Sequence, residues 1–450
     1  MLPENFIQSV QHLKGFDKEK FEAIHNSEEQ ITSVRINPEK KCSIFLEEEY
    51  KQVAWCKYGF YLPERPSFTL DPCFHAGAYY VQEASSMFLW HIVEQIFGTN
   101  TEQKILDVCA APGGKSTLLA SYFYNGLIVS NEVIKQRAAV LAENITKWGT
   151  TNNIVTNNDP KNFAYLKNYF DAVVIDAPCS GSGMFRKDVT AVEEWSLDNV
   201  TLCSQRQQRI IADVWDSLKE NGYLIYSTCS YSEEENEQIT DWIMDNFIAK
   251  SVQIFIPNNW HIETTQSNKH KAFGYRFYPD KIKGEGFFIT VLQKKESIAT
   301  HKFKQQQLQQ PTKQELALLN SFIVLQNEVK LFKYHNEIKA IDEKWYNDVA
   351  ILSQQLYIKK AGTIIGEIKG KDFVPHHELA VGTLRLSNIA TLELDKDNAL
   401  QYLRKKEIAV SSPNKGMVLV TYQGLSLGWI KVMQHRMNNY YPSEWRILKS

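Results

Sequence analysis

Two cysteines and a glycine-rich loop are the residues of this chain whose types and spacing could do chemistry. The loop is CAAPGGKST, from Cys109 to Thr117. It departs from the phosphate-binding pattern G-x-x-x-x-G-K-[ST], because Cys109 replaces the first glycine. The cysteines are Cys179 in DAPCSGSGMFRKD and Cys229 in STCSYSEEENE. Thiolates are strong nucleophiles, so two cysteines, each followed by serine, indicate covalent catalysis rather than buried apolar side chains.

All three stretches fall at the ends of strands in a predicted parallel sheet. Short β-rich runs alternate with helical stretches, which is the pattern of parallel strands joined by helices. The expected strands are KILDV, GLIVSNE, NIVTNND, FDAVVIDAP and GYLIYSTCS, followed by a hairpin of GYRFYPDK and GEGFFITVLQK. Ligands of such α/β sheets bind beyond the carboxyl ends of the strands. The sequence therefore predicts a binding site that the loop and both cysteines share.

Carboxylates at the same strand ends indicate which ligand binds there. Of the carboxylates Glu132, Asp159 and Asp176, the first two would repel a triphosphate. They suit a ligand with an amino group, a sulfonium and ribose hydroxyls, and S-adenosylmethionine has all three. The main enzymatic alternative is a P-loop-like ATPase, because Lys115 and Ser116 could serve phosphate and magnesium and VVIDAP is similar to a Walker B strand.

A nucleophile beside a methyl donor predicts methylation of a pyrimidine at carbon 5. That carbon is too electron-poor to attack a sulfonium methyl, but thiolate addition at carbon 6 turns the ring into an enamine that can. Asp176 precedes Cys179 by three residues and is placed to protonate N3 of the ring. A second thiol can assist release of the product. The residues alone do not say whether Cys179 or Cys229 makes the bond.

The motifs CAAPGGKST, NEV, DAPCSGSGMFRKD, YSTCSYSEEENE and GEGFF, in that order, resemble those of the Nop–Sun family of RNA 5-methylcytosine methyltransferases. The resemblance covers roughly residues 76–295 and is strongest to the bacterial branch that modifies small-subunit ribosomal RNA. It implies methylation of cytosine in ribosomal RNA through a covalent cysteine adduct. Transfer RNA is an alternative substrate, and a non-catalytic ribosome assembly factor is the alternative without chemistry.

The resemblance also implies a role for each site residue. It makes Cys229 the nucleophile, has Cys179 assist product release, and places Asp176 between cofactor and cytosine. DNA cytosine methyltransferases use a Pro-Cys nucleophile instead, which would nominate Cys179. Glu132 is expected to hold the ribose of S-adenosylmethionine, and Asp159 to lie near its adenine. The residues expected to line its methionine part are Cys109, Ala110, Ala111, Pro112, Gly113, Gly114 and Lys115.

Basic residues in two places are candidates for RNA contacts. Arg186 and Lys187 follow the Pro-Cys loop and could hold phosphates beside a flipped base. Residues 401–450 contain eight Lys or Arg and two Glu, a net charge of +6 in a chain whose net charge is -2. There Lys431 and Arg436 interleave with aromatic residues, a pairing that suits RNA. This segment is similar to the PUA-like module of the bacterial branch.

The length of 450 residues predicts two or three domains. We expect an α/β architecture built around a Rossmann-like S-adenosylmethionine-dependent methyltransferase core. A small N-terminal α+β domain would span residues 1–75, the catalytic domain 76–298, a linker 299–315, and a C-terminal RNA-binding region with a PUA-like β-rich module 316–450.

Composition excludes several other classes of protein. Hydrophobic residues make up 43% of the chain and charged residues 23%, as is usual for a soluble globular protein. Seven cysteines without a C-x-x-C pair argue against a disulfide framework and a structural zinc, and we expect no metal site. No apolar run is long enough for a membrane span, and the charged N-terminus lacks the pattern of a signal peptide. We therefore expect a cytoplasmic, monomeric protein.

Overall fold

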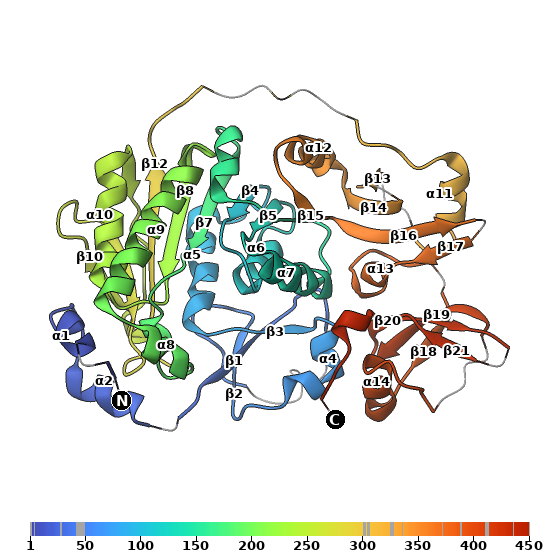
Figure 1. The fold of residues 1–450 in the computed structure, drawn as a ribbon, viewed down its shortest axis with the longest axis horizontal. Helices are drawn as coiled ribbons and strands as arrows, with labels where there is room; N and C mark the ends of the chain where they lie inside the picture. Colours follow the sequence, from blue (N-terminus) through green and yellow to red (C-terminus); the bar gives the residue numbers. More distant parts are fainter. Residues whose placement is uncertain are drawn as a thin grey trace.

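The computed structural model centres on one mixed sheet of ten strands (Figure 1). Its hydrogen-bonded order is β10-β11-β12-β8-β7-β4-β5-β6-β15, and β9 pairs with β12. The residues that the structure describes are 2–3, 5–27, 29–41, 50–299, 303, 307–324, 328–334, 336–370, 372–387, 389–409, 414–434 and 436–449.

Five neighbouring strands of this sheet run parallel and carry the residues of interest at their carboxyl ends. They are β4 (Lys104–Asp107), β5 (Leu127–Asn131), β6 (Asn153–Thr156), β7 (Phe170–Asp176) and β8 (Leu218–Thr228). The chain runs outward from β4 through β5 to β6 and then returns to β7 on the other side of β4. A crevice forms at such a switch point, and ligands of open α/β sheets bind there.

Antiparallel strands extend the sheet on both sides. Beyond β8, the expected hairpin is present as β11 and β12. Beyond β6, the last strand is β15, which comes from the C-terminal part of the chain and which the sequence did not predict. The antiparallel strands are β9 (Ala249–Ser251), β10 (Glu263–Gln266), β11 (Phe273–Phe277), β12 (Phe287–Lys294) and β15 (Ile358–Ala361).

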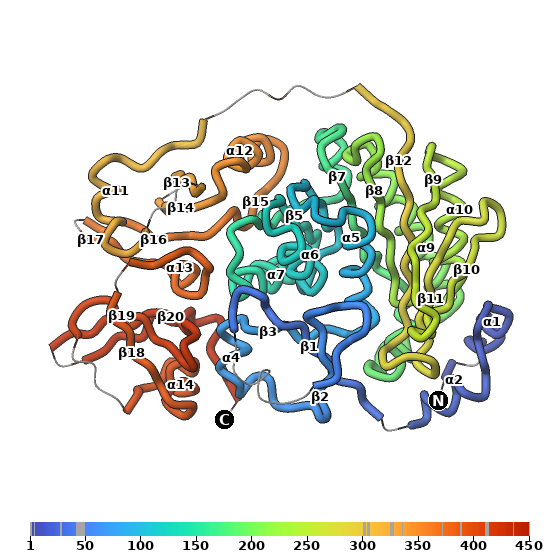
Figure 2. Tube along the Cα trace, turned by 180° about the vertical axis from the view of Figure 1, so that it is seen from behind, coloured from blue at the N-terminus to red at the C-terminus, as the bar shows by residue number. Residues whose placement is uncertain are grey.

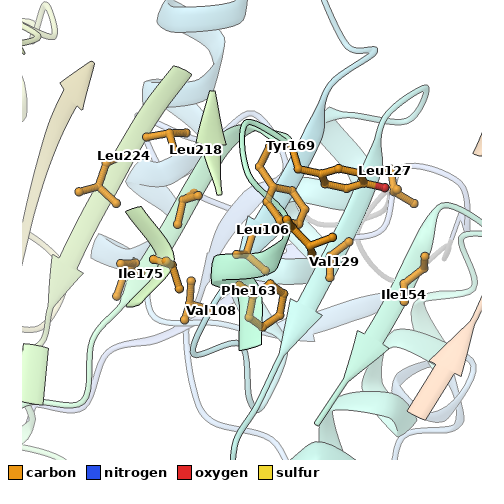
Figure 3. Close-up of a cluster of buried hydrophobic side chains, with 14 of the residues drawn as sticks. Leu106, Val108, Leu127, Val129, Ile154, Phe163, Tyr169, Ile175, Leu218 and Leu224 are labelled. Atoms are coloured by element: carbon orange, nitrogen blue, oxygen red, sulfur yellow. The ribbon is translucent and has the colours of Figure 1, made fainter. Parts of the chain in front are cut away.

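Apolar strand residues form a core on each face of the sheet because both faces are covered by helices. One face packs against α9, α10 and α12, and the other against α5 and α6. Figure 3 shows Leu106 and Val129 near Phe163, with Ile175 and Ile154 of the neighbouring parallel strands further out on either side in the same buried cluster. The helices are α5 (Phe88–Phe97), α6 (Gly114–Tyr122), α7 (Lys135–Trp148), α8 (Val189–Glu194), α9 (Leu197–Trp215), α10 (Glu237–Asn246) and α12 (Tyr346–Gln355).

The N-terminal segment forms a small antiparallel sheet of order β2-β1-β3. Its third strand lies beyond residue 75, so this unit continues past the expected boundary. The helices α1 and α2 pack through Phe6 and Phe21 against Phe185 and Trp195 of the catalytic domain. The elements are α1 (Phe6–Val10), α2 (Lys18–His25), β1 (Thr32–Ile36), β2 (Gly59–Leu62), α4 (Pro72–His75) and β3 (Tyr79–Val81).

The C-terminal part contains two further four-stranded sheets, which lie beside the β15 edge of the central sheet (Figures 1 and 2). The first includes α11 (Lys313–Leu319), β13 (Val329–Tyr334), β14 (Glu337–Asp342), β16 (Thr363–Lys369), β17 (Asp372–Pro375) and α13 (His377–Val381). The second includes β18 (Thr391–Glu393), α14 (Lys396–Leu403), β19 (Gly416–Tyr422), β20 (Leu425–Val432) and β21 (Met437–Asn439). None of the helices in the described ranges has the length and apolarity that crossing a bilayer requires.

Truncating a core residue of β4 tests this packing. Leu106 is completely buried, and Leu106→Ala should lower the free energy of unfolding by about 2–5 kcal/mol because it leaves a cavity. Urea denaturation measures the change. The control Leu448→Ala removes a side chain that is 81% exposed and should change stability by less than about 0.5 kcal/mol. Equal effects of the two substitutions would contradict the packing described.

Candidate active site

The two cysteines meet because they follow adjacent parallel strands. β7 and β8 pair with Asp176 opposite Ser227, so both chains leave the sheet at the same level. The sulfur atoms of Cys179 and Cys229 lie 3.0 Å apart. The hydrogen bond between them, together with burial, raises the pKa of the Cys179 thiol well above its usual value. The raised pKa means that the Cys179 thiol keeps its proton, and either sulfur atom could be the donor in the contact between them.

A charged pair lies beside the thiols. Lys115 Nζ is 2.8 Å from Asp176 Oδ2, and the Ser227 hydroxyl donates to Asp176 Oδ1 at 2.8 Å. The Lys115 ammonium also lies 5.1 Å from the centre of the Phe287 ring. A lysine of a phosphate-binding loop would have to face phosphate, whereas this one is paired with a carboxylate. The charge arrangement therefore disfavours a triphosphate as the ligand.

The glycine-rich loop follows β4, and the buried carboxylate of Asp107 lies at the end of that strand. Ser116 Oγ donates to Asp107 Oδ2 at 2.6 Å, whereas Asp107 Oδ1 has no hydrogen-bond partner among the described residues. Burial raises the pKa of Asp107 to about 7 despite the Ser116 hydrogen bond. At Gly113, φ is +118°, and an added Cβ would lie 3.2 Å from Leu141. The loop thus needs glycine at this turn.

A pocket of about 500 Å³ opens between this loop and the thiols. The sequence-predicted residues that line it are Cys109, Ala110, Ala111, Pro112, Gly114, Lys115, Asp176 and Cys229. The sequence-predicted residues that lie outside its lining in the described structure are Gly113, Glu132, Asp159 and Cys179. The structure therefore brings the loop, the Cys229 thiol and Asp176 together around this pocket. Glu132 and Asp159 lie further along the edge of the sheet.

Glu132 and Asp159 lie at the ends of the next two strands, β5 and β6. Glu132 is almost fully buried; its Oε1 accepts from the Ile134 amide at 2.9 Å, and its Oε2 is 3.5 Å from Arg137. Asp159 accepts from the Lys161 amide at 3.1 Å. In the order β7-β4-β5-β6, the thiols, the loop and these carboxylates follow one another. A ligand extended along this edge could reach all of them.

Asn131 and Asn158 fix the β6 end of this arrangement. The Asn131 side chain donates to the carbonyls of Val108 and Asn158 at 3.2 and 3.0 Å and accepts from the Asn158 amide at 3.1 Å. The Asn158 side chain then exchanges two hydrogen bonds of 3.0 Å with the main chain of Tyr357, just before β15. The loop that carries Asp159 is therefore held by the C-terminal part of the chain.

The N-terminal sheet supplies one wall of the pocket, which the sequence did not predict. Tyr80 and Gln82 line the pocket. Arg35, fully buried, donates to Gln82 Oε1 at 2.8 Å, to the Gly114 carbonyl at 3.1 Å and to Thr117 Oγ1 at 2.5 Å. A single guanidinium thereby ties the N-terminal sheet to the glycine-rich loop. Gly114 lies 79 residues after Arg35, so no local sequence pattern indicates this contact.

The basic residues after the Pro-Cys loop are paired with a buried carboxylate. Arg186 and Lys187 lie 3.5 and 3.6 Å from the two oxygens of Glu285. Arg186 also donates to the Glu29 carbonyl at 2.6 Å, and its side chain is only 4% exposed. The structure therefore does not support the expected contact between Arg186 and RNA phosphate, because its charge is already buried in an ion pair. Lys187 is more exposed and remains a candidate.

The two C-terminal candidates for RNA contacts are Lys431, which lies on β20, and Arg436, which lies just before β21. Arg436 is exposed and lines a pocket of about 850 Å³ together with Lys406 and Tyr440. Lys431 is half-buried on β20 and is not among the residues lining that pocket. Trp429 is completely buried and donates to the His376 carbonyl at 2.9 Å, so this aromatic residue belongs to the core.

The residues that line the pocket of about 500 Å³ beside the glycine-rich loop, which we call the main pocket, have the chemistry to bind S-adenosylmethionine. The free oxygen of Asp107 suits the positive charge of such a ligand, and the small residues of AAPGG leave room for close approach. The Rossmann-like sheet with a switch point at β4 and β7, and a carboxylate at the end of β5, define the core of a methyltransferase.

Comparison with known proteins identifies the family. Residues 95–293 match the family described as 16S rRNA methyltransferase RsmB/F, residues 2–84 the N-terminal domain of 16S rRNA methyltransferase RsmF, and residues 389–447 the methyltransferase RsmF PUA domain. Ribosomal RNA small subunit methyltransferase F of Psychromonas ingrahamii is 30% identical over 412 residues, which cover 87% of this chain and 84% of that one. The Vibrio vulnificus protein of the same name is 27% identical, with 98% and 97% covered.

A solved structure of a methyltransferase homolog has a fold similar to that of this chain. The methyltransferase homolog protein from Pyrococcus horikoshii superposes with a TM-score of 0.55 and 28% identity, covering 65% of this chain and 95% of that one. The chain therefore belongs to the RsmB/F family of RNA methyltransferases. The expected family, fold class and enzyme class are confirmed, and the P-loop-like ATPase alternative is wrong.

The raised pKa of Asp107 predicts that cofactor affinity depends on pH. Asp107 is mostly neutral below a pH of about 7 and ionised above it, so a cationic ligand beside it is held more tightly as the pH rises. Calorimetric titration with S-adenosylmethionine should show affinity increasing through this range. Asp107→Asn should bind more weakly and lose that increase, whereas Asp397→Asn on the exposed side of α14 should keep it. A retained increase in Asp107→Asn would exclude this assignment.

Proposed function

We propose that this protein transfers the methyl group of S-adenosylmethionine to carbon 5 of a cytosine in small-subunit ribosomal RNA. The observation that carries the proposal is the pair of sulfur atoms of Cys179 and Cys229, 3.0 Å apart at the edge of the main pocket. The relatives are named ribosomal RNA small subunit methyltransferases, and this favours ribosomal RNA over transfer RNA as the substrate. Such an enzyme would act in the cytoplasm as a monomer.

Cys229 is the nucleophile in this proposal. It lines the pocket, and its sulfur lies 3.0 Å from the sulfur of Cys179, whose raised pKa keeps that thiol protonated. The Cys229 thiolate adds to carbon 6 of the cytosine, so electron density shifts through the ring to carbon 5. S-adenosylmethionine supplies the methyl group on a sulfonium, which carbon 5 then attacks. A stacked base could not reach the sulfur, so the target cytosine has to be flipped or unpaired.

Asp176 and Lys115 stabilise the ring during this addition. Negative charge develops at N3 of the cytosine when the thiolate adds, and Asp176 neutralises it by passing on a proton that the paired Lys115 ammonium supplies. The Lys115 ammonium, 2.8 Å from Asp176, and the Ser227 hydroxyl orient the carboxyl group. These contacts support the role of Asp176 that its sequence position predicts.

Cys179 acts in the release of product. Elimination transfers the proton of carbon 5 to water, breaks the bond between Cys229 and carbon 6, and returns the proton on N3 to Asp176. The departing Cys229 thiolate regains the hydrogen bond from Cys179, and this stabilises the leaving group. Without Cys179 the adduct should form but break down slowly.

The cofactor and RNA contacts follow from the same layout. We assign the methionine part of S-adenosylmethionine to the glycine-rich loop with Asp107, its ribose to Glu132 and its adenine side to the loop at Asp159. Lys187 beside the thiols, together with Arg436 and Lys431 of the C-terminal module, is assigned to RNA phosphates. The positive charge of this module supports that assignment.

Substitution of each thiol tests the mechanism. The protein is incubated with ribosomal RNA and radiolabelled S-adenosylmethionine, and the RNA is digested to nucleosides. Label should appear in 5-methylcytidine. Cys229→Ala should abolish transfer, whereas Cys179→Ala should accumulate protein covalently joined to RNA, visible on a denaturing gel.

Cys203→Ala is the matched control, because Cys203 is a buried thiol of α9 outside the pocket lining. It should transfer methyl groups at the normal rate. Label in methylated adenosine would exclude cytosine as the substrate. Adduct formation by Cys229→Ala would reverse the roles of the two thiols.

A further inference from the structure

One buried carboxylate contacts both cysteine loops. Glu235 ends the short helical turn Glu233–Glu235, and it is completely buried. Its Oε1 accepts from the Ser180 amide at 2.8 Å and from Gln207 Nε2 at 3.1 Å. Its Oε2 accepts from the hydroxyls of Ser180 and Ser230, each at 2.5 Å. Every hydrogen bond of this carboxylate in the described structure therefore comes from a cysteine loop or from α9.

The two serines that donate to Glu235 are the residues next to the two site cysteines. Ser180 directly follows Cys179, and Ser230 directly follows Cys229. We propose that Glu235 is a positioning residue, which holds the residues next to both thiols and thereby sets the short distance between their sulfur atoms. This proposal rests on the proposed function, since it assigns to Glu235 the alignment of the two thiols that the methyl transfer uses.

The pairing of β7 and β8 alone does not fix the sulfur atoms. The ladder of the two strands ends at Asp176 and Ser227, and one further main-chain bond joins the Ala177 amide to the Ser227 carbonyl. Beyond it, the Gly183 amide donates to the Cys229 carbonyl at 2.8 Å. These bonds hold the main chain of the loops, whereas Glu235 acts on the residues adjacent to each sulfur.

The burial of Glu235 is offset by the donors of the two cysteine loops. Burial raises the pKa of Glu235, although the hydrogen bonds of Ser180 and Ser230 lower it. Removing the carboxylate would leave the Ser180 amide and the two serine hydroxyls without this acceptor, which is costly inside the protein. Glu235 is also outside the lining of the cofactor pocket. Its effect on the reaction should therefore run through the thiols and leave cofactor binding unchanged.

Two variants of Glu235 separate the positioning role from general stability. Glu235→Gln keeps an oxygen for the Ser180 amide and an amide group for the hydroxyl oxygens, whereas Glu235→Ala removes every bond. Glu234→Gln is the matched control, because the Glu234 side chain is exposed one residue earlier. Ser230→Ala removes one hydrogen bond of Glu235, together with the contacts of the Ser230 hydroxyl to Ser180, Ser182 and the Ser232 amide, and it serves if Glu235→Ala does not fold.

The first measurement reports the sulfur geometry without RNA. Diamide oxidises two nearby thiols to a disulfide, taking up their two protons and two electrons, and mass spectrometry quantifies the linked Cys179 and Cys229 peptides. The second measurement is methyl transfer to ribosomal RNA, and the third is the affinity for S-adenosylmethionine. All are made on the full-length protein.

Glu235→Ala should slow disulfide formation about tenfold and methyl transfer about 100-fold, because small displacements of reacting groups are costly. Glu235→Gln should stay within about threefold of wild type in both assays, Ser230→Ala should fall between the two, and Glu234→Gln should match wild type. Cofactor affinity should be unchanged throughout.

Wild-type rates of disulfide formation and transfer in Glu235→Ala, or in Ser230→Ala if the former does not fold, would overturn the proposal. Equal losses in a folded Glu235→Gln and in Glu235→Ala would also overturn it, because charge rather than position would then be the cause. If wild-type protein fails to methylate RNA, the proposed function fails, and the disulfide measurement still decides whether Glu235 aligns the thiols.

Discussion

The parallel pairing of β7 with β8 is the constraint on which the site depends. Because Asp176 lies opposite Ser227, the two chains leave the sheet together, and the thiols that follow them are brought within hydrogen-bonding distance. A shift of one residue in this register would turn one of the two loops toward the other face of the sheet. The buried apolar strands that fix the register are therefore as necessary for the chemistry as the sulfur atoms.

The remainder of the site is assembled from segments that are distant in sequence. Arg35 joins the N-terminal sheet to the glycine-rich loop, and Asn158 joins the loop after β6 to Tyr357. Arg35 and Asn158 are themselves buried, and polar groups of buried side chains are costly to leave unpaired, so these hydrogen bonds favour one arrangement. The site as a whole is thus formed by three regions of the chain, which are the N-terminal sheet, the catalytic sheet and the C-terminal part.

Sequence patterns were sufficient for the strands and for the loop because both are local signals. Strand ends identified Asp176, Glu132 and the cysteines, and the resemblance to a family ranked the two thiols. The patterns could not show that Arg186 is buried against Glu285, since that pairing depends on the packing of loops far apart in the chain. The same reason hid the raised pKa of Asp107, which comes from burial.

The strand β15 has a consequence for how this protein can be divided. It covers the edge of β6, and the residue before it holds the loop of Asp159. A fragment that stops after β12 would leave β6 as an open edge, with main-chain groups available for pairing with another molecule. The catalytic sheet is therefore completed by a segment made late in synthesis, and a nascent chain carries an unfinished edge until that segment has emerged.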